Sequence, residues 1–127
     1  MQVIHTDAAP AAIGTYSQAV LVGNMVYISG QIPLHPETME VVHTSIEDQI
    51  AQVFKNLAAI CQKAGGSLNN LAKITVYLTD LKNFSKVNEA MERLFTLPFP
   101  ARAVIEISAL PRGVDVEIDG IMVVPQS

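Results

Sequence analysis

The sequence predicts a single α+β domain of two layers, in which two helices cover one face of a mixed sheet of about six strands. Its 127 residues are the usual size of one domain, so residues 1–127 are expected to form one core. Two segments repeat apolar residues at helical spacing, whereas the others are rich in β-branched residues and end at turn residues. The expected order of elements is therefore βββ–α–β–α–ββ.

Three strands are expected at the start of the chain. Residues 2–5 are the first candidate, and residues 17–22 and 25–29 follow. The last two are separated by Gly23-Asn24, a two-residue turn signal, and so predict a hairpin. Residues 35–38, His-Pro-Glu-Thr, are expected to form an exposed turn.

The clearest helix begins near Thr44. Thr44 and Glu47 have the three-residue spacing of a capping box, and Gly65-Gly66 supplies the stop, since glycine tolerates the left-handed conformation at a helix end. Between them one apolar stripe recurs at spacings of three and four residues. The stripe consists of Ile46, Ile50, Phe54, Leu57, Cys61 and Ala64.

The second half of the chain predicts a strand, a helix and two more strands. The strand spans residues 74–78, and the helix runs from about residue 84 to 95, with Asn83 as N-cap and Pro98 beyond its end. Strands 103–107 and 114–124 follow, joined by a bend at residues 110–113. The inward side chains of the helix are expected to be Val87, Met91, Leu94 and Phe95.

Composition narrows the classes of function. Half of the residues are apolar and 16% are charged, so the sheet face without helices is expected to pack against other subunits in a symmetric oligomer. A formal charge of −4 argues against nucleic acid as a partner, and scattered Lys and Arg argue against a membrane surface. With no signal peptide and no apolar run of bilayer length, a cytoplasmic protein is expected.

Arg102 is the first candidate for a functional residue. It stands at the start of a predicted strand, after a proline-containing turn and within apolar sequence. A guanidinium there can hold a carboxylate or phosphate through two parallel hydrogen bonds. The alternative is a surface arginine paired with Glu106 or Glu92. Spacing alone leaves both interpretations open.

Glu117 is the second candidate. It lies on the polar face of the alternating strand, and neighbouring strands could bring it within reach of Arg102. A carboxylate there could orient or deprotonate water. The alternative is a solvated strand face that Glu117 shares with Asp115 and Asp119.

Four further positions could contribute to a site. The Tyr16 hydroxyl could donate to an anion, Gly30 after Ser29 would let the backbone approach a ligand, and Asn88 could hydrogen-bond to one. Each also has a structural alternative, namely an amphipathic tyrosine, a bulge and an exposed helix asparagine.

The remaining reactive side chains suggest no metal and no organic cofactor. Cys61, the only cysteine, lies on the apolar stripe and is interpreted as a buried hydrophobe rather than a nucleophile. His35 and His43 could meet across a turn, but with His5 they share no metal-ligand spacing. Gly-rich phosphate loops and nucleophile elbows are missing as well.

Taken in order, these segments closely resemble the RidA/YjgF family of reactive-intermediate deaminases, over nearly the whole chain. The matching pieces are residues 8–19 (AAPAAIGTYSQA), Gly23-Asn24, 29–33 (SGQIP), 75–81 (TVYLTDL) with Phe84, Val87 and Asn88, 99–102 (FPAR), Leu110-Pro111 and 116–118 (VEI). The resemblance implies a chorismate-mutase-like fold and a homotrimer whose active sites lie between subunits.

The resemblance also implies an activity, that of a 2-iminobutanoate/2-iminopropanoate deaminase. Such enzymes hydrolyse enamines and imines such as 2-aminoacrylate to 2-oxo acids and ammonia, so a small imino or oxo acid is the implied partner. By this resemblance Arg102 grips the substrate carboxylate and Glu117 positions the attacking water. The pocket is lined by Tyr16, Ser29, Gly30 and Asn88, and the Val104 backbone N–H is available to the carboxylate.

The sequence departs from the family pattern at three places. Val104 stands where many members have cysteine, Thr15 stands where proline is common, and residues 96–98 form a shorter segment. A role that needs a thiol at position 104 is therefore ruled out. The alternative function is a non-catalytic, carboxylate-binding trimer that senses metabolites or acts like a chaperone. The ribonuclease and translation-inhibition activities linked to the family rank third, because the chain is acidic.

Overall fold

A computed structural model of the chain describes residues 1–126 and contains eight main elements in the predicted order. The strands are β1 (Gln2–Ile4), β2 (Ala19–Val22), β3 (Met25–Gln31), β4 (Leu71–Leu78), β5 (Ala101–Glu106) and β6 (Val116–Val123). The helices are α1 (Ile46–Lys63) and α2 (Phe84–Leu94), and short 3₁₀ turns cover Leu68–Asn70, Leu81–Asn83 and Pro111–Gly113. Neither α1 nor α2 is both long and apolar enough to span a bilayer.

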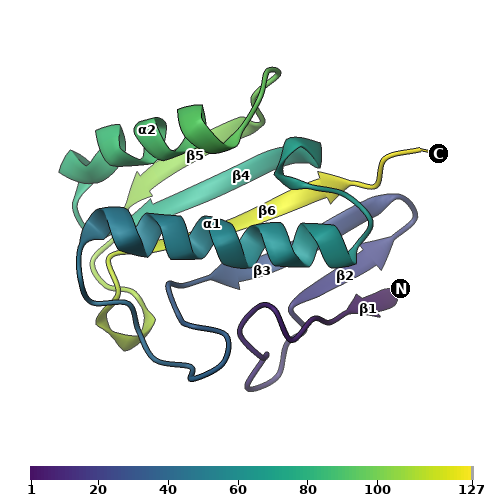
Figure 1. Ribbon diagram of the computed structural model, residues 1–127, viewed down its shortest axis with the longest axis horizontal. Helices are drawn as coiled ribbons and strands as arrows, with labels where there is room; N and C mark the ends of the chain where they lie inside the picture. Colours follow the sequence, from purple (N-terminus) through teal and green to yellow (C-terminus); the bar gives the residue numbers. More distant parts are fainter. Residues whose placement is uncertain (127) are drawn as a thin grey trace.

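The strands form one mixed sheet in the order β1-β2-β3-β6-β4-β5. Strands β4 and β5 run parallel because α2 connects them as a crossover, whereas the other neighbours are antiparallel. Figure 1 shows both helices lying across the same face of this sheet. The predicted α+β fold of two layers is thus confirmed.

Helix α1 supplies much of the core through the predicted stripe. Its central residues Ile50, Phe54, Leu57 and Cys61 are buried, and Ile46 and Ala64 pack against the core at the two ends. The glycine stop is also confirmed. Gly65 has φ +97°, and the amides of Gly65 and Gly66 donate to the carbonyls of Gln62 and Cys61, which is a Schellman arrangement.

The capping box predicted at Thr44 and Glu47 is wrong. Ser45, not Thr44, is the N-cap, and its side-chain oxygen accepts the Asp48 amide at 3.0 Å. Thr44 instead donates its hydroxyl to the Asp48 carboxylate. Thr44 and Ser45 each precede an acidic residue by three positions, so the sequence pattern fits both registers and could not choose between them.

Two expectations for helix α2, a capping bond from Asn83 and an inward Leu94, are wrong. Asn83 occupies the N-cap position but makes no side-chain capping hydrogen bond. Val87 and Met91 are buried as predicted, whereas Leu94 is 43% exposed. The helix ends at Leu94 and the backbone of Phe95 is extended, so Phe95 turns to the core and its ring contacts Phe54 edge to face at 5.6 Å between centroids.

The contrast between Leu57 and Leu94 predicts a difference in stability. Leu57 is fully buried, so Leu57→Ala is expected to lower the free energy of unfolding by about 2–5 kcal/mol. Leu94→Ala removes the same atoms from an exposed position and should cost less than about 1 kcal/mol. Urea denaturation at one protein concentration measures both changes. Equal losses would contradict the burial described for these two leucines.

Strand boundaries differ from the predicted ones by one to three residues. Strand β4 begins at Leu71 rather than at residue 74, and β6 is shorter than 114–124 at both ends. Strand β5 spans Ala101–Glu106 rather than 103–107, because it pairs with β4 from Ala101 opposite Lys73 onward. Arg102 therefore lies within an edge strand of the sheet.

The sheet face opposite the helices carries exposed apolar side chains on both sides of the acidic Glu117 and Asp119 of β6. Val20, Tyr27 and Ile121 are neighbours across β2, β3 and β6 on this face. Tyr27 and Ile105 are each 44% exposed there. A face of this kind is energetically costly to leave in water.

Candidate functional site

Five of the seven predicted site residues line two separate cavities. Tyr16, Gly30 and Glu117 line a cavity of about 490 Å³, called here the Glu117 cavity. Asn88 and Arg102 line another of about 400 Å³ beside α2, called here the Arg102 cavity. The N-terminal loop, the loop after β3 and the turn before β6 gather near one end of the sheet, at the lower edge of Figure 1.

Sheet topology separates Arg102 from Glu117. Strand β4 lies between β5 and β6, so the two strands that carry these residues are not neighbours. Arg102 pairs in register with the buried Ile74 and so points to the helix face, whereas Glu117 pairs with Tyr77 on the opposite face. The expectation that neighbouring strands bring Glu117 within reach of Arg102 is therefore wrong within one chain.

Arg102 is held by a helix and is not neutralised. Its Nη1 donates to Asn88 Oδ1 at 2.6 Å, and its guanidinium carbon lies 5.0 Å from the centroid of the Phe84 ring. Within residues 1–126 no ion pair joins it to an acidic side chain. Glu106 instead accepts the Leu81 amide at 2.9 Å, and Glu92 lines the Arg102 cavity without pairing. The guanidinium keeps donors for a ligand.

Phe84 is a site residue that was not predicted as one. It precedes Asn88 by four positions on α2, so the two side chains share one face of the helix. Phe84 stacks against the Arg102 guanidinium, and Asn88 accepts a hydrogen bond from it. The spacing of four between Phe84 and Asn88 is the signal that could have found this residue.

Glu117 has an environment that favours its protonated form. Burial, and secondly the nearby charge of Asp119, raise the pKa of the Glu117 carboxyl above its ordinary value of 4.5. Asp119 accepts the Tyr77 hydroxyl at 2.9 Å, and this hydrogen bond is the main reason that the pKa of Tyr77 is raised. A carboxyl with a raised pKa at the wall of a cavity is suited to proton transfer.

Gly30 is required because Glu117 occupies the space beside it. The pairing of β3 with β6 shifts between Ile28 and Gln31, which confirms a bulge at this point. A Cβ atom at Gly30 would lie 2.8 Å from Glu117 Cδ, closer than carbon atoms pack. Of the two interpretations of Gly30, a bulge and a close approach to a ligand, the bulge is confirmed, and within this chain the carboxylate of Glu117 occupies the space beside the glycine.

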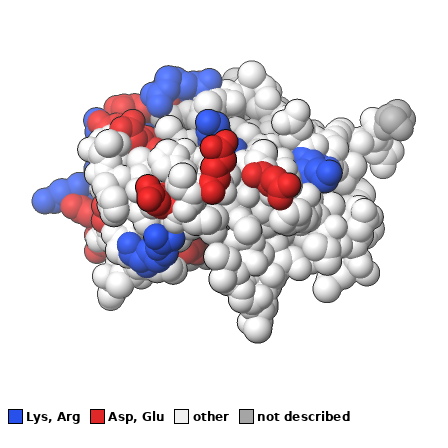
Figure 2. Space-filling model, turned by 60° about the horizontal axis from the view of Figure 1, so that its bottom comes forward, with Lys and Arg blue, Asp and Glu red and all other residues white. Residues whose placement is uncertain are grey.

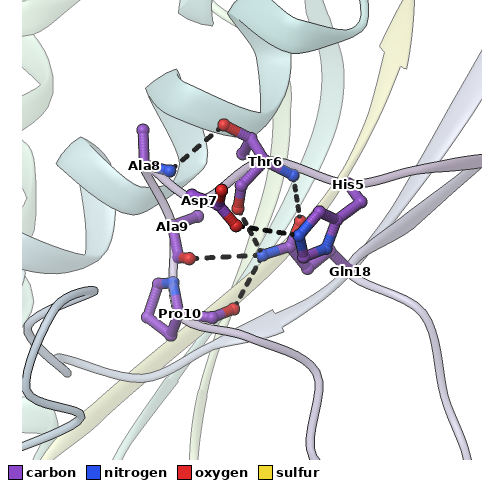
Figure 3. Close-up of polar contacts among 7 residues, drawn as sticks. All are labelled: His5, Thr6, Asp7, Ala8, Ala9, Pro10 and Gln18. Carbon is purple, nitrogen blue, oxygen red and sulfur yellow. Dashed lines mark hydrogen bonds and ion pairs between the residues drawn. The ribbon is translucent and has the colours of Figure 1, made fainter.

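Gln18 lines the Glu117 cavity, and Figure 3 shows its side chain bonded to the loop that contains Thr6, Ala9 and Pro10. Its side chain is 2% exposed. Nε2 donates to the carbonyls of Thr6, Ala9 and Pro10, and Oε1 accepts the Thr6 amide at 2.8 Å. A buried amide that makes all these bonds fixes the loop before Tyr16. Gln18 lies in the matching segment 8–19, but no local pattern in the sequence indicates that its side chain is buried.

Ser29 and Val104 lie apart from both cavities. Ser29 donates its hydroxyl to the Ser17 carbonyl at 2.6 Å and, with Tyr16, lines a third cavity of about 420 Å³. Val104 is half-buried and packs against the core. Its backbone belongs to β5, an edge strand, and such a strand has amides that no neighbouring strand pairs.

The other reactive side chains are separate from these cavities. The interpretation of Cys61 as a buried residue is confirmed, and burial raises the pKa of its thiol to about 12. His35 and His43 line a cavity of about 540 Å³ of their own. Within residues 1–126, no three His, Cys, Asp or Glu side chains are grouped so that they could hold a metal ion.

Known proteins are similar to the chain over almost its full length. The family described as Endoribonuclease L-PSP matches residues 6–124. A mouse protein named 2-iminobutanoate/2-iminopropanoate deaminase is 46% identical over 122 residues, which cover 96% of this chain and 90% of the mouse protein.

Two solved structures share the fold. RidA from the Antarctic bacterium Psychrobacter sp. PAMC 21119 superposes with a TM-score of 0.93 at 53% identity, covering 97% of this chain and 99% of that chain. E. coli TdcF, whose structure contains bound serine, has a TM-score of 0.90 at 37% identity and covers all of both chains.

Proposed function

Because the chain belongs to the RidA/YjgF/RutC family, we propose that it hydrolyses reactive 2-enamino and 2-imino acids. Substrates such as 2-aminoacrylate would yield 2-oxo acids and ammonia. The mouse relative carries the name of this activity. The location we propose is the cytoplasm.

The observation that carries the proposal is the state of Arg102. Its guanidinium is stacked on Phe84, oriented by Asn88 and not paired with an acid among residues 1–126. An arginine held in this way has a free edge for the carboxylate that all 2-imino acids share. The bound serine of TdcF, which also has an α-carboxylate, is consistent with a carboxylate site in this fold.

Glu117 is proposed to position and activate the water. The imine carbon is already electrophilic, so no covalent nucleophile is needed. An enamine reacts as its imine tautomer. Water attacks C2 of the protonated imine and passes a proton to the Glu117 carboxylate, and the C=N π electrons become a lone pair on nitrogen. Return of that proton to nitrogen lets ammonia leave as the hydroxyl oxygen forms the C=O bond and gives its remaining proton to Glu117 and then to solvent. The chain contributes proximity and charge placement to both steps.

A homotrimer is proposed to bring the two cavities together. In one chain Arg102 and Glu117 lie on opposite faces of the sheet. A complete site therefore needs the Arg102 cavity of one subunit to meet the Glu117 cavity of another. The exposed apolar side chains of the sheet face opposite the helices, Tyr27 and Ile105 among them, offer surface for such an assembly. Tyr16, Ser29, Gly30 and the Val104 amide would line the combined site.

The raised pKa of Glu117 predicts the pH dependence of turnover. The carboxylate is the active form, so activity should rise with pH through a pKa above the ordinary 4.5. Asp119→Asn removes the negative charge that disfavours ionisation of Glu117, so the rise in activity should occur at lower pH. Glu117→Gln should abolish turnover and, with it, this rise. If the rise stays at the same pH in Asp119→Asn, the role assigned to Glu117 is contradicted.

The test of the proposed function uses a dehydratase that releases 2-aminoacrylate from serine. Purified protein should accelerate formation of pyruvate beyond the uncatalysed rate. If the chain only binds carboxylates, no acceleration appears and Glu117→Gln leaves affinity for pyruvate nearly unchanged. Pyruvate affinity without turnover would therefore establish the alternative, a binding protein.

The name of the matching family also raises a nuclease as a candidate, but the charges do not support one. The chain has eight Lys and Arg against twelve Asp and Glu. On the face shown in Figure 2 the two kinds are interspersed, and no continuous basic area is visible. Phosphate backbones are bound through such areas.

A further inference from the structure

Two residues in the described part of the chain share a rare backbone conformation. Met39 and Arg112 have φ of +61° and +57°, and they are the non-glycine residues with positive φ among residues 1–126. Side chains with a Cβ disfavour this region, and such strain persists where the surrounding structure imposes it. The surrounding structure therefore imposes this conformation at both positions.

The two strained residues are bonded to each other. Arg112 Nη1 donates to the Met39 carbonyl oxygen at 2.7 Å, although 73 positions separate them in the sequence. Within residues 1–126 Arg112 forms no ion pair with an acid. Its guanidinium therefore serves mainly to hold the turn that contains Met39. That turn is closed at its base by the His35 amide, which donates to the Glu40 carbonyl at 2.9 Å.

Both residues lie at the Glu117 cavity. Met39 and Arg112 line it together with apolar side chains from two other segments, among them Ile13, Ile32 and Leu34. The lining thus combines polar side chains, among them Gln18 and Glu117, with a group of apolar side chains that includes Met39. A cavity of about 490 Å³ offers more room than a three-carbon imino acid needs. The apolar part is suited to a longer apolar side chain of the substrate.

We propose that Arg112 is a positioning residue that holds Met39 as a wall of the substrate's side-chain pocket. The pair makes the enzyme prefer 2-imino acids whose side chains are apolar and longer than a methyl group. This inference rests on the proposed function, because the selected ligand is its substrate or product. Arg112 acts through Met39, and Met39 makes the contact with the side chain.

The test compares a long and a short substrate. An L-amino-acid oxidase supplies the imines of leucine and alanine, and the ratio of their kcat/KM values is measured. The ratio should favour leucine in the wild type and fall about fivefold in Arg112→Ala and in Met39→Gly, since both lose the same wall. The double variant should match Met39→Gly alone. Arg112→Lys, which can still donate to the Met39 carbonyl, should keep most of the preference.

A second readout separates this inference from the proposed function. Calorimetry measures the affinities for 4-methyl-2-oxopentanoate and pyruvate, and their ratio should fall in the same variants whether or not the protein turns over imines. Arg93→Ala, which removes an exposed arginine elsewhere, is the matched control. An inactive wild type overturns the deaminase proposal only. The proposal that Arg112 holds Met39 as a pocket wall is wrong if the affinity ratio is unchanged in Arg112→Ala. It is also wrong if the effects of the two substitutions add in the double variant.

Discussion

Replacing Arg102 with alanine is expected to lower kcat/KM for 2-iminopropanoate by about two to three orders of magnitude. The guanidinium is proposed to hold the substrate carboxylate through two charge-assisted hydrogen bonds. Its loss would leave that carboxylate partly desolvated and unpaired at the reacting site. The expected loss appears in both KM and kcat, because a carboxylate that is not held lets the imine carbon move away from the water. The coupled assay of pyruvate formation measures it.

Two controls separate this effect from damage to the fold. Arg102 is exposed and forms no ion pair within residues 1–126, so its removal should change the free energy of unfolding little. Arg102→Lys keeps the charge but not the planar fork, and about a tenfold loss is expected. Unfolding curves and oligomer mass should match the wild type in both variants. Full activity in Arg102→Ala would mean that another group holds the carboxylate.

The fold could be predicted from local patterns, because its elements obey them. The stripe of α1 is buried as expected, and the glycine stop and the β2–β3 hairpin at Gly23-Asn24 are confirmed. Errors occurred at element ends, where two neighbouring residues satisfy the same rule. Ser45 and Thr44 both fit the N-cap position of α1, and Phe95 and Leu94 both fit an inward position at the end of α2. Packing decides such cases, and packing is not local.

The site could be predicted only in part. The residue types made Arg102 and Glu117 candidates beside structural alternatives, and the family resemblance selected them and supplied their roles. Their separation could not be foreseen, because the insertion of β6 between β3 and β4 is a property of the whole sheet. Alternation along one strand does not say which strand is its neighbour. The same limit applies to Arg112, whose bond to Met39 joins two distant turns.

The separation of Arg102 and Glu117 leads to the second large effect, a recovery of activity from two inactive variants. In the proposed homotrimer, Arg102→Ala and Glu117→Gln should each retain about 1% of wild-type activity or less. When both kinds of subunit assemble in one trimer, a Glu117→Gln subunit still offers Arg102 and an Arg102→Ala subunit still offers Glu117. If each site joins these residues across an interface, one orientation of the mixed interface is complete.

The expected recovery is quantitative. In a cyclic trimer with two subunits of one kind and one of the other, one of three interfaces has both residues, whichever kind is in excess. Mixed trimers isolated through two different affinity tags should therefore reach about one third of wild-type activity. Trimers of two differently tagged Arg102→Ala chains are the matched control and should stay inactive. Light scattering should report three chains of 13.7 kDa in each sample. Within one chain the sheet keeps Arg102 and Glu117 apart. If verified mixed trimers recover no activity, the two residues do not serve one site across an interface either, and the proposed shared site is wrong.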